Sequence, residues 1–421
     1  MNLDWHRLKA VVFESDDWGL CAWVPDEQAH RVLADTPAFR ASPGQRYGGS
    51  TLESAADVQR LTAVLLELRG GDGFPPVWQA NTVMASPDYA RLTPPGFEVE
   101  TLPLVDFPAT PARWSRPGLW DELMRAHEAG VWWPELHGLH HLPAHAWLKA
   151  LRRGEADARR AHEQQSPICE AVQASGEYDP AEPAATRALN LALAVGKFRA
   201  LYGRGPGSFC PPDYRWDEST EADAERLGVT TLQGRSERAG QALPRLKHFL
   251  GRYRWPEQEG ARFYLPPRIA FEPAAEDRSA RHAIVEDAHG RIRDAWSRGQ
   301  PAIVSTHRAN YAHLDPARAD AGRAALRDLL VRLAGDEARF FTDAEVRELV
   351  ERGWSARAIG ARGVLVRYFG VPRAPVRLAA PQGTVGASLR EGGGDASVTM
   401  AGGEVELRLD VGEYLVEWRR A

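Results

Sequence analysis

Residues 11–17 read Val-Val-Phe-Glu-Ser-Asp-Asp. A short apolar run with β-branched residues is typical of a buried strand. In parallel α/β enzymes the functional groups follow the carboxyl ends of such strands, as the acidic pair Asp16-Asp17 does here. The segment therefore predicts the first strand of a parallel sheet, with a functional site at its carboxyl edge.

The same arrangement recurs along the chain. Later apolar runs end in Asn81, His137, Asp213 and His307, and a further strand is predicted over residues 339–342. Helical patterns lie between them, over residues 54–68, 119–128, 143–165, 181–201, 218–227, 280–298, 315–334 and 343–352. This alternation predicts an α/β fold with a parallel (β/α) barrel of about seven strands. No glycine-rich phosphate loop follows the first strand, which disfavours an open nucleotide-binding sheet.

The pattern changes after about residue 355. Short apolar runs, separated by glycine-rich turns such as 392–394, occupy residues 364–368, 376–378, 387–389, 405–409 and 414–418. Closely spaced short strands of this kind predict a small all-β domain of the sandwich type. We therefore expect a barrel domain over residues 1–352 and a β domain over residues 353–421.

The composition excludes several classes of partner. The net charge is -5 and no extended basic block occurs, so neither a nucleic acid nor a membrane surface is indicated. No stretch approaches the ~20 apolar residues that a membrane span requires. The 3 cysteines lie far apart, which favours a reducing compartment over a disulfide framework. Because the N-terminus lacks the pattern of a signal peptide, we expect a cytoplasmic protein.

A histidine cluster, His137-Gly-Leu-His-His141, follows one of the predicted strands. If the strand gives way to a helical turn, the i, i+4 spacing places the imidazoles of His137 and His141 on one side. Two histidines and one aspartate match the open donor set of catalytic zinc sites. Asp17 would supply the aspartate, and a cation there would offset the repulsion between the adjacent carboxylates. His140 is an alternative i, i+3 partner, His145 is expected on a helix surface, and a histidine-rich surface turn is the plainer interpretation.

His307 ends the apolar strand at residues 302–307. A histidine at the carboxyl end of a strand can act as a general acid near neutral pH. A single histidine is more often a core or rim residue, so its interpretation depends on the other segments.

Taken in chain order, these segments resemble the polysaccharide deacetylase family, metal-dependent carbohydrate esterases with the nodulation-deacetylase type of homology domain. The resemblance covers roughly residues 8–345. It implies a distorted (β/α) barrel in which Asp16 is the general base and His307 the general acid. It implies that Asp17, His137 and His141 hold the metal.

The family's third motif is matched by residues 209–214, Phe-Cys-Pro-Pro-Asp-Tyr. The resemblance implies that Pro212, Asp213 and Tyr214 line the substrate groove and that a backbone N–H there meets the oxyanion. The implied metal is Zn²⁺, with Co²⁺ or Ni²⁺ as alternatives. It would activate a water and polarise the acyl carbonyl, while Asp16 takes the proton of the water and His307 protonates the leaving group.

Two departures from the family pattern stand out. Cys210 occupies the position of an arginine that orients the base, and we expect Arg215 or Arg308 to replace that arginine. Trp18 follows the metal-binding aspartate. We expect its ring to stack on a sugar or to narrow the groove toward a small substrate.

These residues indicate a metal-dependent hydrolase that removes an acyl group, such as acetyl, from an N- or O-acylated sugar or polysaccharide. Two alternatives remain open. One is hydrolysis of a small non-sugar amide, as in the allantoinase-like branch of the same superfamily. The other is a non-catalytic carbohydrate-binding barrel, which the loss of the motif arginine at Cys210 favours.

Overall fold

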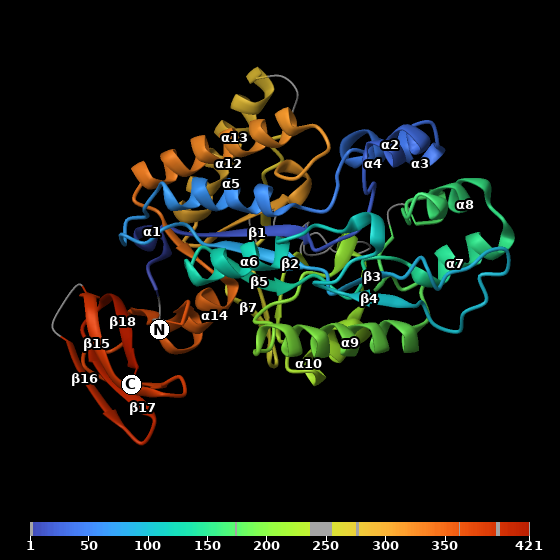
Figure 1. Ribbon diagram of the computed structural model, residues 1–421. Helices are drawn as coiled ribbons and strands as arrows, with labels where there is room; N and C mark the ends of the chain where they lie inside the picture. The colour runs from blue at the N-terminus through green and yellow to red at the C-terminus, as the bar shows by residue number, and fades with distance from the viewer. Residues whose placement is uncertain are drawn as a thin grey trace.

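The chain forms a parallel sheet followed by two antiparallel sheets (Figure 1). The structure is a computed structural model, and it describes residues 3–172, 175–235, 255–274, 278–361, 363–392 and 396–420. Within these residues, no helix combines the length and the apolar character needed to cross a membrane.

Strand β1 lies at the centre of the parallel sheet and pairs with β2, β10 and β11. The strands in order are β5 (Trp132–Leu136), β2 (Trp78–Thr82), β1 (Ala10–Trp18), β10 (Ala302–His307) and β9 (Arg268–Ala270), with β11 (Arg339–Phe341) also on β1. Residues 10–16 of β1 are all buried. A strand covered on both faces needs a continuous apolar run, which is why residues 11–13 show no alternation.

Further short strands and isolated β-bridges extend this sheet beyond β5 and curve it toward a barrel. The end of β5 bridges to Phe209, and Phe209 bridges to β6 (Thr231–Leu232), both in parallel. Strand β6 pairs in parallel with β8 (Arg262–Tyr264), to which β7 (Glu257–Glu259) adds an antiparallel partner. The predicted parallel α/β barrel is confirmed. It is distorted, because Phe209 contributes only bridges and no ladder joins β8 to β9 within the described ranges.

Helices cover both sides of the sheet. In Figure 1, α5, α12 and α13 lie along one side, and α9 and α10 lie along the other. The barrel helices are α1 (Trp5–Leu8), α5 (Ala55–Leu66), α6 (Leu119–Glu128), α9 (Ala184–Tyr202), α10 (Glu218–Arg226), α12 (Arg278–Ser297), α13 (Pro316–Gly335) and α14 (Asp343–Arg352). Capping boxes fix the starts of α5 and α14: the side chains of Ser54 and Thr342 accept from Asp57 and Glu345 backbone N–H groups.

Additional short elements gather at one end of the barrel (Figure 1). They are α2 (Glu27–Leu33), α3 (Pro37–Arg40), α4 (Ser42–Tyr47), β3 (Ala85–Pro87), β4 (Leu104–Asp106), α7 (Ala144–Arg153) and α8 (Ala156–Glu163). Single helical turns occur at Ala112–Trp114, Glu170–Val172, Pro212–Tyr214 and Arg308–Asn310. The helical pattern predicted over residues 143–165 is divided into two helices, α7 and α8. Gly154 ends α7 in the left-handed region, at φ 74°, a conformation that glycine adopts without strain.

The last part of the chain is all-β, as predicted. One antiparallel sheet has the order β12 (Trp354–Ile359), β13 (Gly363–Tyr368), β18 (Gly412–Arg420) and β15 (Thr384–Gly392), and the other has the order β14 (Pro375–Ala379), β17 (Glu404–Leu409) and β16 (Ala396–Ala401). Apolar side chains of both sheets share one core. The buried Arg367 of β13 donates to Asp72 and Glu345, which joins this region to the barrel.

Candidate metal centre and its neighbours

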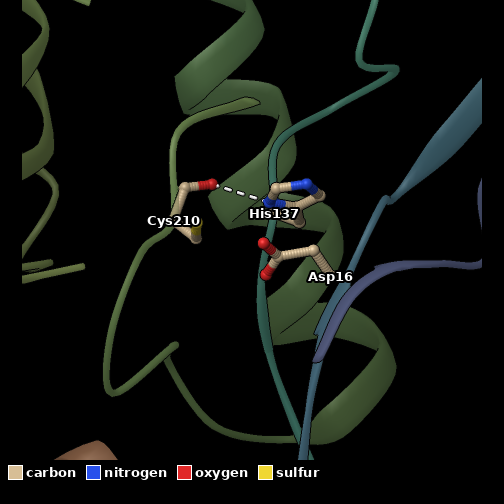
Figure 2. A group of neighbouring side chains, drawn as sticks. All are labelled: Asp16, His137 and Cys210. Carbon is tan, nitrogen blue, oxygen red and sulfur yellow. Dashed lines mark hydrogen bonds between the residues drawn. The ribbon is translucent and has the colours of Figure 1, made fainter. Parts of the chain in front are cut away.

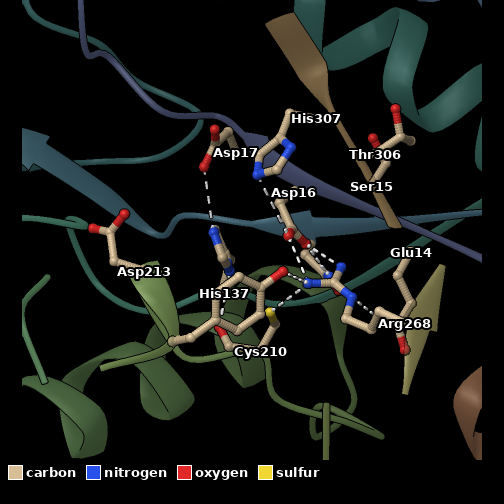
Figure 3. Close-up of polar contacts among 12 residues, drawn as sticks. Glu14, Ser15, Asp16, Asp17, His137, Cys210, Asp213, Arg268, Thr306 and His307 are labelled. Atoms are coloured by element: carbon tan, nitrogen blue, oxygen red, sulfur yellow. Dashed lines mark hydrogen bonds and ion pairs between the residues drawn. The ribbon is translucent and has the colours of Figure 1, made fainter. Parts of the chain in front are cut away.

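The two acidic residues at the end of β1 have different partners (Figure 3). Asp16 is 2% exposed and lies in register with His307 of β10. Asp17 has a φ of 74°, and the pairing of β1 with β2 shifts between Ser15 and Trp18. Because of this irregularity, the Asp17 carboxylate points toward His137 and His141, in the loop that follows β5. Arg268 lies beside the Asp16 carboxylate, whereas His137 and His141 lie beside that of Asp17, and these cationic or polar neighbours offset the mutual repulsion of the two acids.

The Asp17 carboxylate contacts two imidazoles. Its Oδ1 lies 3.3 Å from Nε2 of His137 and 3.4 Å from Nε2 of His141. The expected helical turn is wrong, because residues 137–143 form a loop in which Gly138 has a φ of 111° and His141 a φ of 62°. The loop nevertheless brings the three predicted ligands together, with their donor atoms within 4.8 Å of one another.

These donor atoms fit a four-coordinate divalent cation. Ligand atoms at ~2.0–2.1 Å from a tetrahedral metal stand roughly 3.3 Å apart, which the two contacts of Asp17 match. Nδ1 of His137 donates to the carbonyl oxygen of Cys210 at 2.8 Å, so its Nε2 lone pair is left for a metal. Burial alone raises the pKa of Asp17, but the neighbouring His137 and His141 outweigh it and hold that pKa below its usual range.

A second trio of donor atoms lies close by, from Asp16, His137 and Cys210 (Figure 2). It is the weaker candidate for two reasons. Burial raises the pKa of the Cys210 thiol well above its ordinary value, and only the thiolate is a good ligand. Asp16, in addition, is already bound by Arg268 and Asn81.

Arg268, at the start of β9, is the cationic partner of Asp16 (Figure 3). Its Nη1 and Nη2 donate to the two carboxylate oxygens at 2.9 and 3.0 Å. The same Nη1 donates to Tyr214 Oη at 2.7 Å and lies 3.5 Å from Cys210 Sγ. Burial alone raises the pKa of Asp16, but Arg268 outweighs it and lowers the pKa to about 2. Asp16 is therefore ionised and held in a fixed orientation.

A second buried carboxyl group holds Arg268 from the other side. Glu14 is fully buried, and its Oε2 lies 2.6 Å from Arg268 Nε. Burial and the neighbouring Asp343 raise the pKa of Glu14 well above its usual range, although Arg268 opposes them. The Arg268 guanidinium is thus held at Nε by Glu14 and at both Nη atoms by Asp16.

Neither arginine expected to replace the motif arginine lies at Asp16. Arg215 donates to Asp179 at 3.2 Å. Arg308 is 1% exposed and donates to the Leu20 carbonyl and to Glu53 at 2.8 and 3.1 Å. The expectation is corrected: Arg268 fills this position, and Arg308 supports the loop that follows β1.

His307 faces Asp16 with one edge and Glu272 with the other. Nδ1 lies 2.5 Å from Glu272 Oε1, and Nε2 lies 3.9 Å from Asp16 Oδ2. Asn310 donates to the second oxygen of Glu272 at 2.7 Å. Burial alone lowers the pKa of His307, but the Glu272 carboxylate outweighs it and raises the pKa to about 10. His307 is therefore a cation near neutral pH, with Nε2 toward the centre of the site.

The third motif forms a tight turn beside the histidines. Asp213 and Tyr214 both have a φ of 53°, and Pro212 before them is buried. The Asp213 carboxylate lies 3.9 Å from Nδ1 of His141, and Tyr214 meets Arg268 as described. These residues border the candidate metal centre, and their expected role in lining a substrate groove stays a prediction.

Trp18 does not lie in a groove. It is 1% exposed, donates from Nε1 to Ser15 Oγ at 2.9 Å and packs edge-on against Trp132 at 4.6 Å. The expectation that its ring meets substrate is corrected, because the turn at Asp17 directs Trp18 into the barrel core. An aromatic ring does lie at the site, but it belongs to Tyr47 of α4. This side chain is half-buried, and its ring centroid lies 5.7 Å from that of His307.

The alternative ligand His140 points away from Asp17. It is 2% exposed, its Nδ1 accepts from the Leu142 backbone at 3.2 Å, and Nε2 lies 3.3 Å from Asn190. Burial lowers its pKa to about 3, so the ring is neutral. His145 is exposed on α7, as expected.

The sequence analysis missed Arg268, Glu272 and Tyr47. Arg268 begins β9 and Glu272 follows it, in the segment Pro267-Arg268-Ile269-Ala270-Phe271-Glu272. For Glu272, a polar residue after the carboxyl end of an apolar run, the signal is the one that identified His307. It was weak here because β9 has only 3 residues.

Comparison with known proteins gives structural likeness alone. No family model matches the chain, and no curated protein matches it. A Mycobacterium smegmatis protein described as a polysaccharide deacetylase matches at 15% identity and a TM-score of 0.41, over 81% of this chain and 89% of its own. Agd3, described as a novel carbohydrate deacetylase, matches at 11% identity and 0.41, over 97% and 64%. The BpsB deacetylase domain from Bordetella bronchiseptica matches at 15% identity and 0.25, over 53% and 87%. At these values the likeness carries no argument about activity.

Proposed function

We propose that the chain is a divalent-metal-dependent hydrolase that removes an acyl group, such as acetyl, from an N- or O-acylated sugar or polysaccharide. One observation carries the proposal. A donor set suited to a metal, a carboxylate bound by arginine and a histidine bound by a carboxylate converge at the carboxyl ends of β1, β5 and β10. Metal-assisted hydrolysis of an amide, or of an ester with a poor leaving group, uses these three elements: an electrophilic centre, a base and an acid.

Each group has a distinct role in this proposal. Asp17, His137 and His141 hold the cation, for which Zn²⁺ suits two imidazoles and one carboxylate, with Co²⁺ or Ni²⁺ as alternatives. A divalent cation there supplies the Lewis acidity that lowers the pKa of water and polarises a carbonyl oxygen.

The protein's own groups move the protons. Asp16, ionised and oriented by Arg268, accepts a proton from the attacking water. His307, kept protonated by Glu272, donates a proton from Nε2 to the leaving amine or alkoxide. The turn at Asp213 and Tyr214 borders this space and supplies polar contacts to substrate.

The two alternatives lose part of their support. The non-catalytic barrel was suggested by Cys210, and Arg268 now supplies the missing cation at Asp16. The small-amide substrate was suggested by Trp18 beside the metal, and Trp18 is buried. The motif order, with its resemblance to the polysaccharide deacetylase family, favours an acylated sugar.

A substrate panel tests the proposal. The purified full chain, loaded with Zn²⁺ or Co²⁺, is assayed on N-acetylated chitooligosaccharides, p-nitrophenyl acetate and allantoin, before and after chelation. We expect release of acetate from an acetylated substrate, loss of activity on chelation and recovery when metal returns. Negligible bound metal after loading would contradict the proposal, and activity on allantoin alone would replace the sugar with a small amide.

Arg268→Lys is expected to lower kcat/KM by up to about 100-fold without loss of bound metal, because a misplacement of about 1 Å near the reacting atoms can cost that much. Lysine keeps the charge but cannot bind both oxygens of Asp16 as the guanidinium does. Arg215→Lys, which alters an arginine bound to Asp179, is the matched control and should retain activity. Equal activity of the two variants would remove Arg268 from the mechanism.

Glu272→Gln is expected to move the alkaline limb of the kcat/KM profile to lower pH. His307 donates a proton only when it is protonated, so activity falls as the pH rises through its pKa. Glu272 raises that pKa to about 10, and its neutral replacement lowers it toward the ordinary value. A profile of kcat/KM against pH measures the shift, and a limb that stays in place would mean that another group titrates there.

A further inference from the structure

The loop between β5 and α7 carries His141 and has an unusual backbone. It connects Leu136, the last residue of β5, to Ala144, the first of α7. Gly138 and His141 both lie in the left-handed region, at φ 111° and 62°. Left-handed backbone at a non-glycine residue is disfavoured, so contacts elsewhere must hold the loop in this form.

The buried carboxylate of Glu177 makes such contacts. Its Oε1 accepts from the Leu139 backbone N–H at 2.7 Å and from that of His141 at 3.3 Å, and its Oε2 accepts from that of His140 at 3.3 Å. The Glu177 side chain is fully buried. Three successive N–H groups that converge on one carboxyl group form a backbone nest, which fixes the course of the chain.

Gly138 leaves the space that Glu177 occupies. A Cβ atom at position 138 would lie 2.1 Å from Oε1 of Glu177, far inside van der Waals contact. A side chain there would displace the carboxylate even if the left-handed backbone were tolerated. Glycine at this position therefore follows from two constraints, its φ of 111° and the approach of Glu177.

We propose that Glu177 is a positioning residue for the metal centre, which sets the loop so that Nε2 of His141 meets Asp17 and Nε2 of His137. This inference rests on the proposed metal-dependent function. Asp17 lies within β1 and His137 directly follows β5, whereas the placement of His141 depends on the loop. Outer partners of metal ligands typically contribute ~10–100-fold to metal affinity, and Glu177 acts here on the backbone that bears the ligand.

Glu182 offers a matched control on the same segment. It is also buried, and its two carboxylate oxygens accept from the backbone N–H groups of His145 and Ala146, at 2.9 and 3.1 Å. It therefore holds the first turn of α7 with the same chemistry, without contact to the loop of residues 138–141.

The test compares Glu177→Gln, Glu177→Asp and Glu182→Gln with wild type, all as the full chain. Zn²⁺ affinity is measured by competition with a chromophoric chelator, and amide hydrogen exchange of residues 138–142 is measured without metal. We expect both Glu177 variants to bind Zn²⁺ about 10–100-fold more weakly and to exchange Leu139, His140 and His141 faster. Glu182→Gln should keep the wild-type affinity and exchange faster only at the start of α7.

The outcomes separate the inference from the proposed function. Wild-type affinity and exchange in both Glu177 variants would overturn the positioning role while the metal site stands. A loss of affinity in either Glu177 variant without faster exchange at residues 139–141 would overturn it too, since the loop would then be unchanged. A wild-type chain that binds no Zn²⁺ would refute the proposed function. Exchange at residues 139–141 would then still decide whether Glu177 holds the loop.

Discussion

Replacing Asp17 with alanine is expected to abolish hydrolysis and to weaken metal binding by more than about 100-fold, because even an outer partner of a ligand contributes ~10–100-fold. Asp17 is the anionic member of the donor set, and its Oδ1 lies 3.3 and 3.4 Å from the two imidazole nitrogens. Without it, two neutral nitrogens would have to hold a divalent ion alone. Metal content after dialysis and turnover of an acetylated substrate measure the two effects.

Asp213→Ala is the control for this experiment. Its carboxylate also lies near His141, 3.9 Å from Nδ1, but on the side of the ring away from the Nε2 contact, and it is 38% exposed. We expect this variant to retain the metal. An Asp17→Ala protein with full activity would refute the assignment of the site even if it contained metal.

His307→Ala is expected to lower kcat by ~10²–10⁴-fold, the usual contribution of a positioned general acid, with metal content unchanged. The imidazole lies beside Asp16 and outside the metal donor set. Since Glu272 keeps it protonated near neutral pH, its loss removes the proton that the leaving group requires.

The leaving group decides whether His307 acts as an acid. An amine or alkoxide leaves poorly unless it is protonated, whereas p-nitrophenolate leaves readily as the anion. We therefore expect His307→Ala to lose much more activity on an N-acetylated sugar than on p-nitrophenyl acetate. Equal losses on both substrates would assign His307 to binding or to structure instead of proton transfer.

The sequence predicted most elements of the barrel because their signals are local. The apolar run of β1 and the capping residues of α5 and α14 lie within a few residues of the elements that they determine, so they can be recognised in the sequence. Strands β12 and β16 were missed, since alanine, serine and arginine dominate β12 and small residues dominate β16. Only pairing with β13 and β17 makes them strands.

The positions of site residues could be predicted where they follow strands with a clear apolar pattern. They could not be predicted where tertiary contacts determine the backbone conformation. Asp17, His137 and His141 come together because β1 and β5 end at one edge of the sheet. The loop geometry around His141 could not be read from the i, i+4 spacing, since Glu177 determines it from outside the motif. The burial of Trp18 likewise follows from the turn at Asp17, which has no signature in the sequence.

The contact between Arg268 and Asp16 spans 252 positions of the chain, and it places Nη1 of the arginine 3.5 Å from the sulfur of Cys210. An arginine introduced at position 210 would bring a second guanidinium into the same buried space, where two like charges repel strongly. We therefore expect positions 210 and 268 to show epistasis: arginine at one requires a small, uncharged side chain at the other. A search pattern that demands arginine within the third motif would miss such a protein, although Arg268 of β9 supplies a guanidinium at Asp16.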